Sequence, residues 1–245
     1  TEWALKAAAA KKHVLLEKPL PGTDSLDELQ AIIDACKANG VQFFDGSMWQ
    51  HSTRTAHIKR DVLDAGALGR VRRVDASFTF NAYKFDDGEA WVDGANGRTD
   101  KTREPWGCFG DQGWYPVSAV MFAVGYELPQ RVQVLHFEKN KVDTVVHGSA
   151  VMWWADGRVA TVEFGCLAAH RSCYTVCGAE GNLVVDDLVG GQGKQNDPFH
   201  AYGEHFTGST YYKMEDVLGR ERTVETPACN HTTEMVRDMS AIALS

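Results

Sequence analysis

The chain has 245 residues, of which 44% are hydrophobic and 24% charged, and its formal net charge is −8 at pH 7. This length suits one large globular domain or two ordinary ones with a sizeable core. The negative charge argues against nucleic acid and against an anionic membrane as partners. The sequence contains no apolar run of about 18 residues, so we expect no transmembrane helix.

The cysteines give no sign of a disulfide framework or a metal site. The six cysteines contain no Cys-x-x-Cys pair, and the nine histidines show no zinc-like spacing with them. We therefore expect reduced thiols, a cytoplasmic protein and no bound metal.

The first 52 residues predict a strand, helix, strand unit. Residues 1–12 indicate a helix and residues 13–17 a strand, and a second helix begins after a cap at Thr23 or Asp24 and ends at Asn39 and Gly40. A short apolar strand follows at 41–44. This βαβ pattern implies a parallel sheet, which needs more than two strands. We expect part of a doubly wound domain whose first half is not in this sequence.

The charged residues Glu17 and Lys18, followed by Pro19, come directly after the first strand. In open α/β sheets, ligands bind at the carboxyl edge of the strands. Because proline restricts the residue before it, Lys18 is expected to be extended. Its ammonium could hold a phosphate or a ribose hydroxyl, or polarise a catalytic group. A surface lysine at the end of a strand fits the local sequence equally well.

From residue 53 onward the pattern changes to one helix and then a series of strands. The helix spans 53–65, and the hairpin turns lie at 154–157 and 178–181. We expect an antiparallel sheet packed against helices. Residues 85–103 indicate a mobile loop, 110–125 a helix, 190–212 an irregular excursion and 230–244 a final helix. The predicted strands are 71–80, 131–138, 145–154, 158–168, 174–177 and 182–185.

Asp111 and Tyr115 are four residues apart, so they share one face if they lie in the first turn of a helix. A carboxylate can orient a tyrosine, and a tyrosine hydroxyl can donate a proton if a nearby ammonium lowers its pKa. Alternatively, Asp111 only caps the helix and Tyr115 packs as a half-buried aromatic.

The polar loop at 45–54 contains a third candidate group. Trp49 could stack on a planar ring, and Arg54 could bind a phosphate or a carboxylate. The alternative is a core tryptophan with a solvated arginine. His51 is interpreted as a loop residue without a catalytic role.

Three stretches, 15–19, 45–49 and 110–115, occur in an order and spacing that resemble the Gfo/Idh/MocA family of NAD(P)-dependent oxidoreductases. The likeness is greatest to its dihydrodiol dehydrogenase and D-xylose dehydrogenase branch. It implies an α/β fold, with residues 1–52 as the C-terminal part of a Rossmann domain. Residues 53–245 then form an α+β domain with a large open, mostly antiparallel sheet, which binds substrate and forms a homodimer.

The resemblance also implies a function and site residues. The reaction is hydride transfer between NADP or NAD and a sugar or dihydrodiol hydroxyl carbon. Tyr115 exchanges the hydroxyl proton and Lys18 stabilises the anion, and Asp111 is the acidic residue one turn earlier. The residues expected to face the cofactor or the substrate are Glu17, Lys18, Pro19, Trp49 and Arg54.

The sequence departs from the family pattern in three places. The glycine-rich nucleotide fingerprint is absent, and the compact glycine cluster at 190–193 follows strands of the second domain. Thr53 stands where the family usually has proline, and Pro116 follows Tyr115 directly. Two alternatives therefore stay open: an inactive homologue that serves as a binding or oligomerisation module, and an enzyme with lyase or hydrolase chemistry.

Overall fold

The computed structural model describes residues 1–21, 25–189 and 210–244. The chain forms two compact units, one made of Thr1–Ser52 and His231–Ser245 and the other of Thr53–Asn230. Residues 231–245, which we expected in the second domain, thus belong to the first unit.

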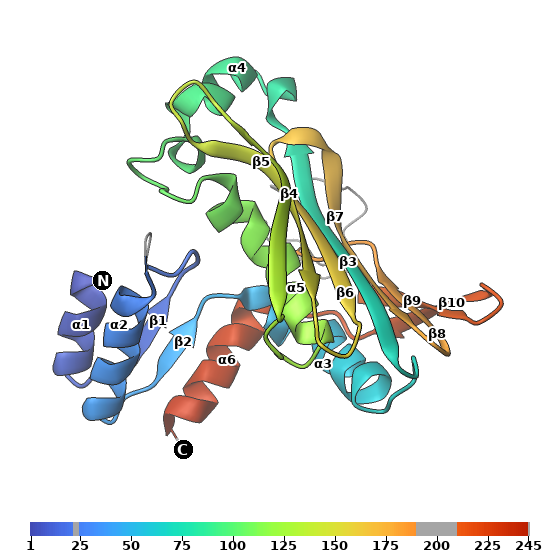
Figure 1. Ribbon diagram of the computed structural model, residues 1–245. Helices are drawn as coiled ribbons and strands as arrows, with labels where there is room; N and C mark the ends of the chain where they lie inside the picture. The colour runs from blue at the N-terminus through green and yellow to red at the C-terminus, as the bar shows by residue number, and fades with distance from the viewer. Residues whose placement is uncertain (22–24, 190–209, 245) are drawn as a thin grey trace. The chain divides into compact units, whose positions relative to one another are not determined.

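The first unit contains the predicted βαβ pattern (Figure 1). Strands β1 and β2 are parallel and pair Val14 with Phe43 and Leu16 with Asp45. The cap predicted at Thr23 or Asp24 lies outside the residues that the structure describes. The elements of this unit are α1 (Glu2–Ala9), β1 (Val14–Leu16), α2 (Asp27–Ala38), β2 (Phe43–Asp45), the 3-10 turn η1 (Met48–His51) and α6 (His231–Leu244).

Helices α1 and α2 form because their small and apolar residues recur on one side. Ala4 and Ala8 of α1 and Ile32 and Cys36 of α2 pack with Val14 of β1 in a single buried cluster. Helix α2 ends where the sequence predicts, since Gly40 adopts a positive φ of 67°. The strand–helix crossover is therefore held by apolar packing.

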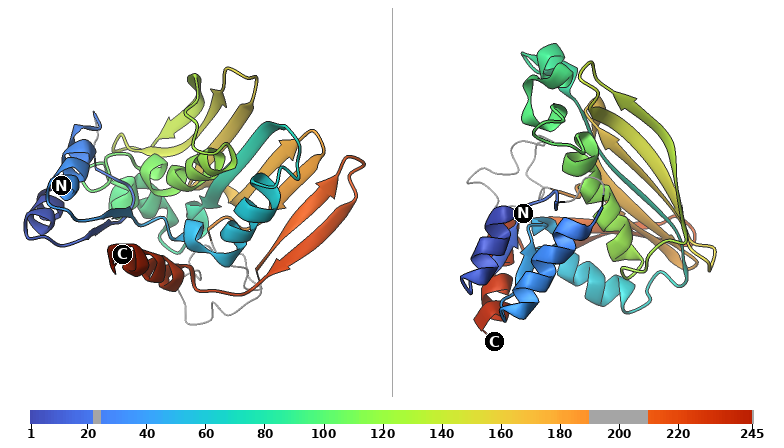
Figure 2. Two further views of the ribbon diagram at one scale, coloured as in Figure 1. Left: turned by 90° about the horizontal axis from the view of Figure 1, so that it is seen from below. Right: turned by 60° about the vertical axis from the view of Figure 1, so that its left-hand side comes forward.

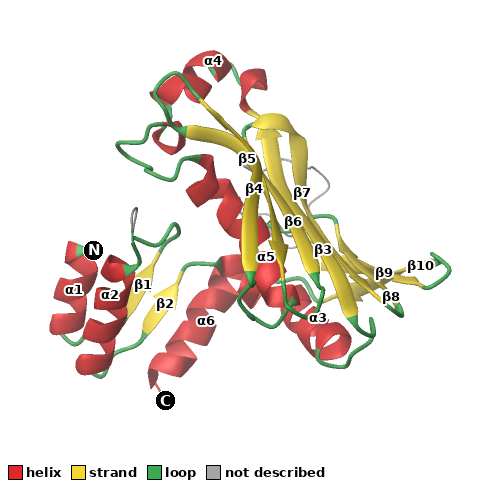
Figure 3. Cartoon of the chain, viewed as in Figure 1, coloured by secondary structure: helices red, strands yellow, loops and turns green. Residues whose placement is uncertain are grey.

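An open sheet of eight strands dominates the second unit (Figure 3). Its order is β10-β9-β8-β7-β3-β6-β5-β4, and only β3 and β6 run parallel. This confirms the predicted large, mostly antiparallel sheet. The strands are β3 (Val71–Asn81), β4 (Arg131–Lys139), β5 (Val145–Trp153), β6 (Val159–Gly165), β7 (Leu167–Gly178), β8 (Gly181–Val185), β9 (Thr210–Asp216) and β10 (Glu221–Thr226).

One face of this sheet carries the long helical segments of the unit (Figure 2). Helix α5 (Trp114–Ala123) packs on β3, β6 and β7, and α3 (Thr53–Ile58) packs on β9 and β10. A π-helical turn, η6 (Phe109–Gly113), leads directly into α5, and another, η2 (Lys59–Leu63), extends α3. We call the sheet surface that contacts α5 the helix face and the opposite surface the outer face.

The structure differs from the prediction in three parts of the chain. Residues 85–103 are not a featureless loop, because they contain helical turns: α4 (Gly88–Ala90), η4 (Trp91–Ala95) and η5 (Gly97–Thr99). Strand β7 starts at Leu167, because the chain turns at Gly165, whose φ is 140°. Strands β9 and β10 were not predicted, and the glycine cluster at 190–193 lies outside the described ranges.

Candidate functional site

The residues Glu17, Lys18 and Pro19 follow β1 at the carboxyl edge of the parallel pair. The N–H of Gly46 donates to the carbonyl of Leu16 at 2.9 Å, so the chain leaves both strands at one point. A Cβ on Gly46 would lie 2.9 Å from the carboxyl carbon of Glu17. The Lys18–Pro19 peptide bond is cis. This edge therefore presents Glu17 closely packed on the backbone of the Asp45 to Ser47 turn.

Trp49 and His51 lie in the same unit, in η1. Trp49 is buried, as the core tryptophan described as its alternative would be. The Nδ1 atom of His51 lies 2.8 Å from a carboxylate oxygen of Asp238 on α6. This hydrogen bond joins the loop between β2 and α3 to the last helix, and the sequence pattern did not indicate it.

Tyr115 lies in the first turn of α5 in the second unit. It is 3% exposed, and its ring meets Phe78 of β3 edge to face, with centroids 5.3 Å apart. The half-buried aromatic described as the alternative is therefore more deeply buried than expected. Packing fixes the direction of the ring, which is a requirement for directional proton transfer.

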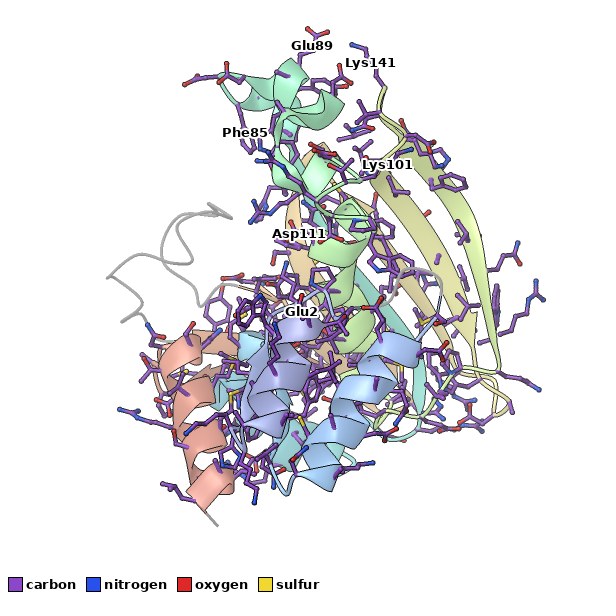
Figure 4. All side chains as sticks on the ribbon, turned by 90° about the vertical axis from the view of Figure 1, so that its left-hand side faces the viewer. Glu2, Phe85, Glu89, Lys101, Asp111 and Lys141 are labelled. Atoms are coloured by element: carbon purple, nitrogen blue, oxygen red, sulfur yellow. The ribbon has the colours of Figure 1, made fainter. Side chains whose placement is uncertain are left out.

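Asp111, labelled in Figure 4, lies in the π-helical turn η6. It forms an ion pair with Arg98 at 2.9 Å. Because a π-helical turn separates it from Tyr115, the condition of an α-helical first turn is not met, and the i, i+4 argument does not apply. Pro116 follows this turn, and a proline lacks the N–H that an uninterrupted α-helix would use there. Asp111 is thus held by a cation rather than by capping alone.

Two residues near this segment were missed from the sequence. Arg98 belongs to η5, within the stretch expected to be a mobile loop, and no spacing rule connects it with Asp111. Gln112 is completely buried, and within residues 1–21, 25–189 and 210–244 neither its amide oxygen nor its amide nitrogen has a hydrogen-bond partner. In the sequence, the burial of Gln112 was indicated only by its place as a polar residue in an otherwise apolar helical pattern.

Arg54 is buried at the start of α3, which rules out the solvated arginine described as its alternative. The side chain is 2% exposed, and Nη2 donates to the carbonyl of Asp187, while Nη1 has no hydrogen-bond partner among the residues that the structure describes. Burial raises the pKa of Tyr174, and the charge of Arg54 opposes that rise. A buried guanidinium with one unsatisfied nitrogen is suited to an anion.

Thr53, which replaces the usual proline, anchors the same helix start. Its N–H lies 3.3 Å from the sulfur of Cys229, and its hydroxyl donates to the carbonyl of Pro227. A second cluster follows on α3, where His57 lies 3.0 Å from the hydroxyl of Tyr212 and 2.9 Å from Asp61. Burial raises the pKa of the Tyr212 hydroxyl.

The predicted site residues are thus distributed over the two units. Glu17, Lys18, Pro19 and Trp49 are in the first, and Arg54, Asp111 and Tyr115 are in the second. Across the described ranges, no group of three or more histidine, cysteine or acidic residues could hold a metal ion. In the same part of the chain, no helix has the length and apolar character to cross a membrane.

Comparison with known proteins gives a family and several relatives. Residues 58–184 match the GFO/IDH/MocA C-terminal domain. A dTDP-3,4-didehydro-2,6-dideoxy-alpha-D-glucose 3-reductase of Streptomyces violaceoruber is 32% identical over 188 residues, which cover 75% of this chain and 50% of that protein. D-xylose 1-dehydrogenase (NADP(+)) 2 of Haloferax volcanii is 29% identical over 185 residues, covering 76% and 52% of the two chains.

Solved structures show the same fold. A 3-ketoreductase from Actinomadura kijaniata, solved with NADP and TDP-benzene, superposes with a TM-score of 0.77 at 22% identity and covers 99% of this chain and 66% of its own. The chain spans about half the length of the curated relatives it matches. From the match over residues 58–184 and the shared fold, the chain belongs to the Gfo/Idh/MocA family.

Proposed function

We propose that the protein carrying this chain is an NADP-dependent oxidoreductase that transfers hydride between nicotinamide and a sugar carbon. The observation that carries this proposal is the alignment of about three quarters of the chain with sugar reductases and a xylose dehydrogenase. These relatives favour a sugar over a dihydrodiol. They also argue against the inactive-module alternative, because each is named for a reduction or an oxidation.

The residues of the chain suit a phosphate-bearing cofactor or substrate. Lys18, with Glu17 and Pro19, follows a parallel strand at its carboxyl edge, where open α/β sheets bind ligands. Arg54 offers a buried cation whose Nη1 atom has no hydrogen-bond partner in the described part of the chain. We propose that these residues, with Trp49 supporting the loop between them, hold the dinucleotide, which supplies the hydride when bound.

The proton chemistry is assigned to Tyr115 and Lys18. Tyr115 exchanges a proton with the substrate hydroxyl, and the ammonium of Lys18 stabilises the negative charge that develops on that oxygen. Asp111 is assigned a positioning role, since its carboxylate already pairs with Arg98. Solved variants of the Actinomadura kijaniata ketoreductase include replacements of a tyrosine and of a lysine, the two residue types given these roles here.

The two parts of the chain would then have different tasks. We propose that residues 1–52 are the C-terminal part of a Rossmann domain, and that residues from 53 onward form the substrate and oligomerisation domain. A homodimer through the outer face of the eight-stranded sheet follows from the same family resemblance. That face carries polar residues such as Asp75, which accepts a hydrogen bond from Thr161.

The roles of Tyr115 and Lys18 are tested by substitution in the full-length protein. We expect Tyr115→Phe and Lys18→Met each to lower kcat for NADPH oxidation with a keto sugar by about 100-fold or more, since each removes a group that moves a proton or stabilises charge. The measurement is steady-state NADPH absorbance. Tyr83→Phe and Lys84→Met, at exposed positions, are the matched controls. Unchanged kcat in both site variants would refute the roles, whereas absence of turnover in the wild type would refute the function.

A further inference from the structure

The two edge strands of the eight-stranded sheet differ in character. Strand β10 is protected by charge, since Glu221, Arg222 and Glu225 are all exposed along it. Strand β4 is nine residues long and fully exposed, yet it carries four large apolar side chains: Val132, Val134, Leu135 and Phe137, each 55–60% exposed. Strand β4 also carries the charged residues Arg131, Glu138 and Lys139, so its exposed apolar side chains are what distinguish it from β10. An edge strand with exposed apolar side chains is a template for pairing with another strand.

Three of these side chains lie on the helix face of the sheet. Val132 pairs with Met152 of β5, Val134 with Ala150 and Phe137 with Gly148. Helix α5 packs on β3, β6 and β7, and the side chains of Val132, Val134 and Phe137 remain more than half exposed. Arg131, Gln133, His136 and Glu138 take the outer face. Apolar and polar residues therefore separate cleanly along β4.

A bulge at the centre of β4 makes this separation symmetric. The pairing with β5 shifts between Val134 and His136, which leaves Leu135 as the extra residue. Because of that extra residue, positions 131 and 138 share a face, as do 132 and 137, and 133 and 136. Two copies of β4 can therefore pair antiparallel, related by a two-fold axis between Val134 and Leu135. In this pairing, each side chain lies opposite a side chain of the second copy that is on the same face of the sheet.

The charges on β4 fit the same register. Antiparallel self-pairing brings Arg131 of one copy opposite Glu138 of the other on the outer face. On the helix face it brings Val132 opposite Phe137, an aromatic beside a β-branched residue. Both kinds of cross-strand pair are favourable. Within its own chain, Arg131 donates to Gln133 and lies 4.7 Å from the Trp153 ring.

We infer that β4 is a self-complementary interface that pairs edge to edge with β4 of a second copy of this chain. The partner is the chain itself, since apolar, polar and charged positions all match in one register. This contact is separate from the homodimer through the outer face and does not depend on the enzymatic function. It joins two eight-stranded sheets into one continuous sheet.

The oligomeric state of the full-length protein tests this interface. We expect Val134→Lys, which places two lysines next to the two-fold axis, to halve the mass measured by light scattering after size exclusion. Leu218→Lys, at an apolar residue 73% exposed in the β9–β10 turn, should leave the mass unchanged. A monomeric wild type, an equal mass in wild type and Val134→Lys, or halving by both variants would overturn the inference.

A cross-link distinguishes edge pairing from pairing through the sheet face and does not require Val134→Lys to fold. Residues 132 and 137 of one strand lie about 16 Å apart, too far for a disulfide within one chain. In the proposed register, each faces the other residue on the second copy. Mild oxidation with a copper–phenanthroline complex should therefore give covalent dimers of the Val132→Cys, Phe137→Cys double variant. Either single variant, or the wild type, should give none, and the same yield in all of them would overturn the edge pairing.

Discussion

Buried polar side chains are the most informative residues of the second unit. Among the described residues, one nitrogen of Arg54 and both the amide oxygen and the amide nitrogen of Gln112 are buried without a hydrogen-bond partner. Each unsatisfied buried group costs about 1–3 kcal/mol, so these atoms oppose the stability of the fold. Arg54 also lies near the fully buried Tyr174, whose raised pKa makes the burial of this region measurable by titration.

Tyr174 should make the stability of the protein depend on alkaline pH. Burial raises the pKa of Tyr174 in the folded state, so the hydroxyl stays protonated while the unfolded chain loses its proton above about pH 10. This contribution to stability is complete below pH 10 and is lost as pH rises towards the folded-state pKa. The free energy of unfolding should therefore fall by about 1.4 kcal/mol per pH unit above pH 10 because of this residue.

Urea denaturation at several pH values from about 9 to 11 measures this slope. Tyr174→Phe should remove the contribution and flatten the decline by one proton, whereas Tyr83→Phe, at an exposed position, should leave the slope as in the wild type. An equal slope in the wild type and Tyr174→Phe would show that Tyr174 ionises normally in the folded protein.

The helices, strands and turns that depend on neighbouring residues could be predicted from the sequence. The βαβ unit and the turns at 154–157 and 178–181 follow from apolar period and glycine positions, and both are present. Strands β9 and β10 are mostly polar, with sequences TYYKMED and ERTVET, so no apolar alternation marked them. The helical turns within 85–103 depend on distant contacts, since Asn140 donates to the carbonyls of Val92 and Thr99.

Some features of the candidate site could likewise be predicted from the sequence, and others depend on tertiary packing. The order of the motifs carrying Lys18 and Tyr115 was readable from the sequence, and so was the helix that carries Tyr115. The ion pair between Arg98 and Asp111 and the burial of Arg54 were not, because both arise from tertiary packing. The π-helical turn at Phe109–Gly113 has no sequence signature that distinguishes it from an α-helical one.

Gly165 determines where β6 ends and β7 begins. Its φ of 140° is a conformation that favours glycine, and a Cβ there would lie 2.6 Å from the Cα of His147 and from the carbonyl oxygen of Val146. We expect Gly165→Ala to lower the free energy of unfolding by more than about 2 kcal/mol, measured in urea. Gly157 also has a positive φ, but a Cβ there would have no other atom within 4 Å. Gly157→Ala should therefore lower the free energy of unfolding by only about 1 kcal/mol. Equal losses in the two variants would show that the β6–β7 connection tolerates a side chain.

In the whole molecule, the residues of the proposed site belong to two different units. The parallel pair with Lys18 at its carboxyl edge belongs to the first unit, and the sheet with Tyr115 on its helix face belongs to the second. The alignments cover only about half of each of these relatives, so the activity is proposed for the full-length protein. Its substrate class rests on relatives that are named for sugars.

Hydride transfer from NADPH to a sugar carbonyl can be followed with an isotope label. Full-length protein would be incubated with a keto sugar and NADPH that carries deuterium at the transferring position of nicotinamide C4. We expect an alcohol product with one deuterium on the newly formed CH–OH carbon, and far less of it with Tyr115→Phe. A product without deuterium, or no reduction across a panel of free and nucleotide-linked keto sugars, would show that the protein does not transfer hydride from NADPH to a sugar.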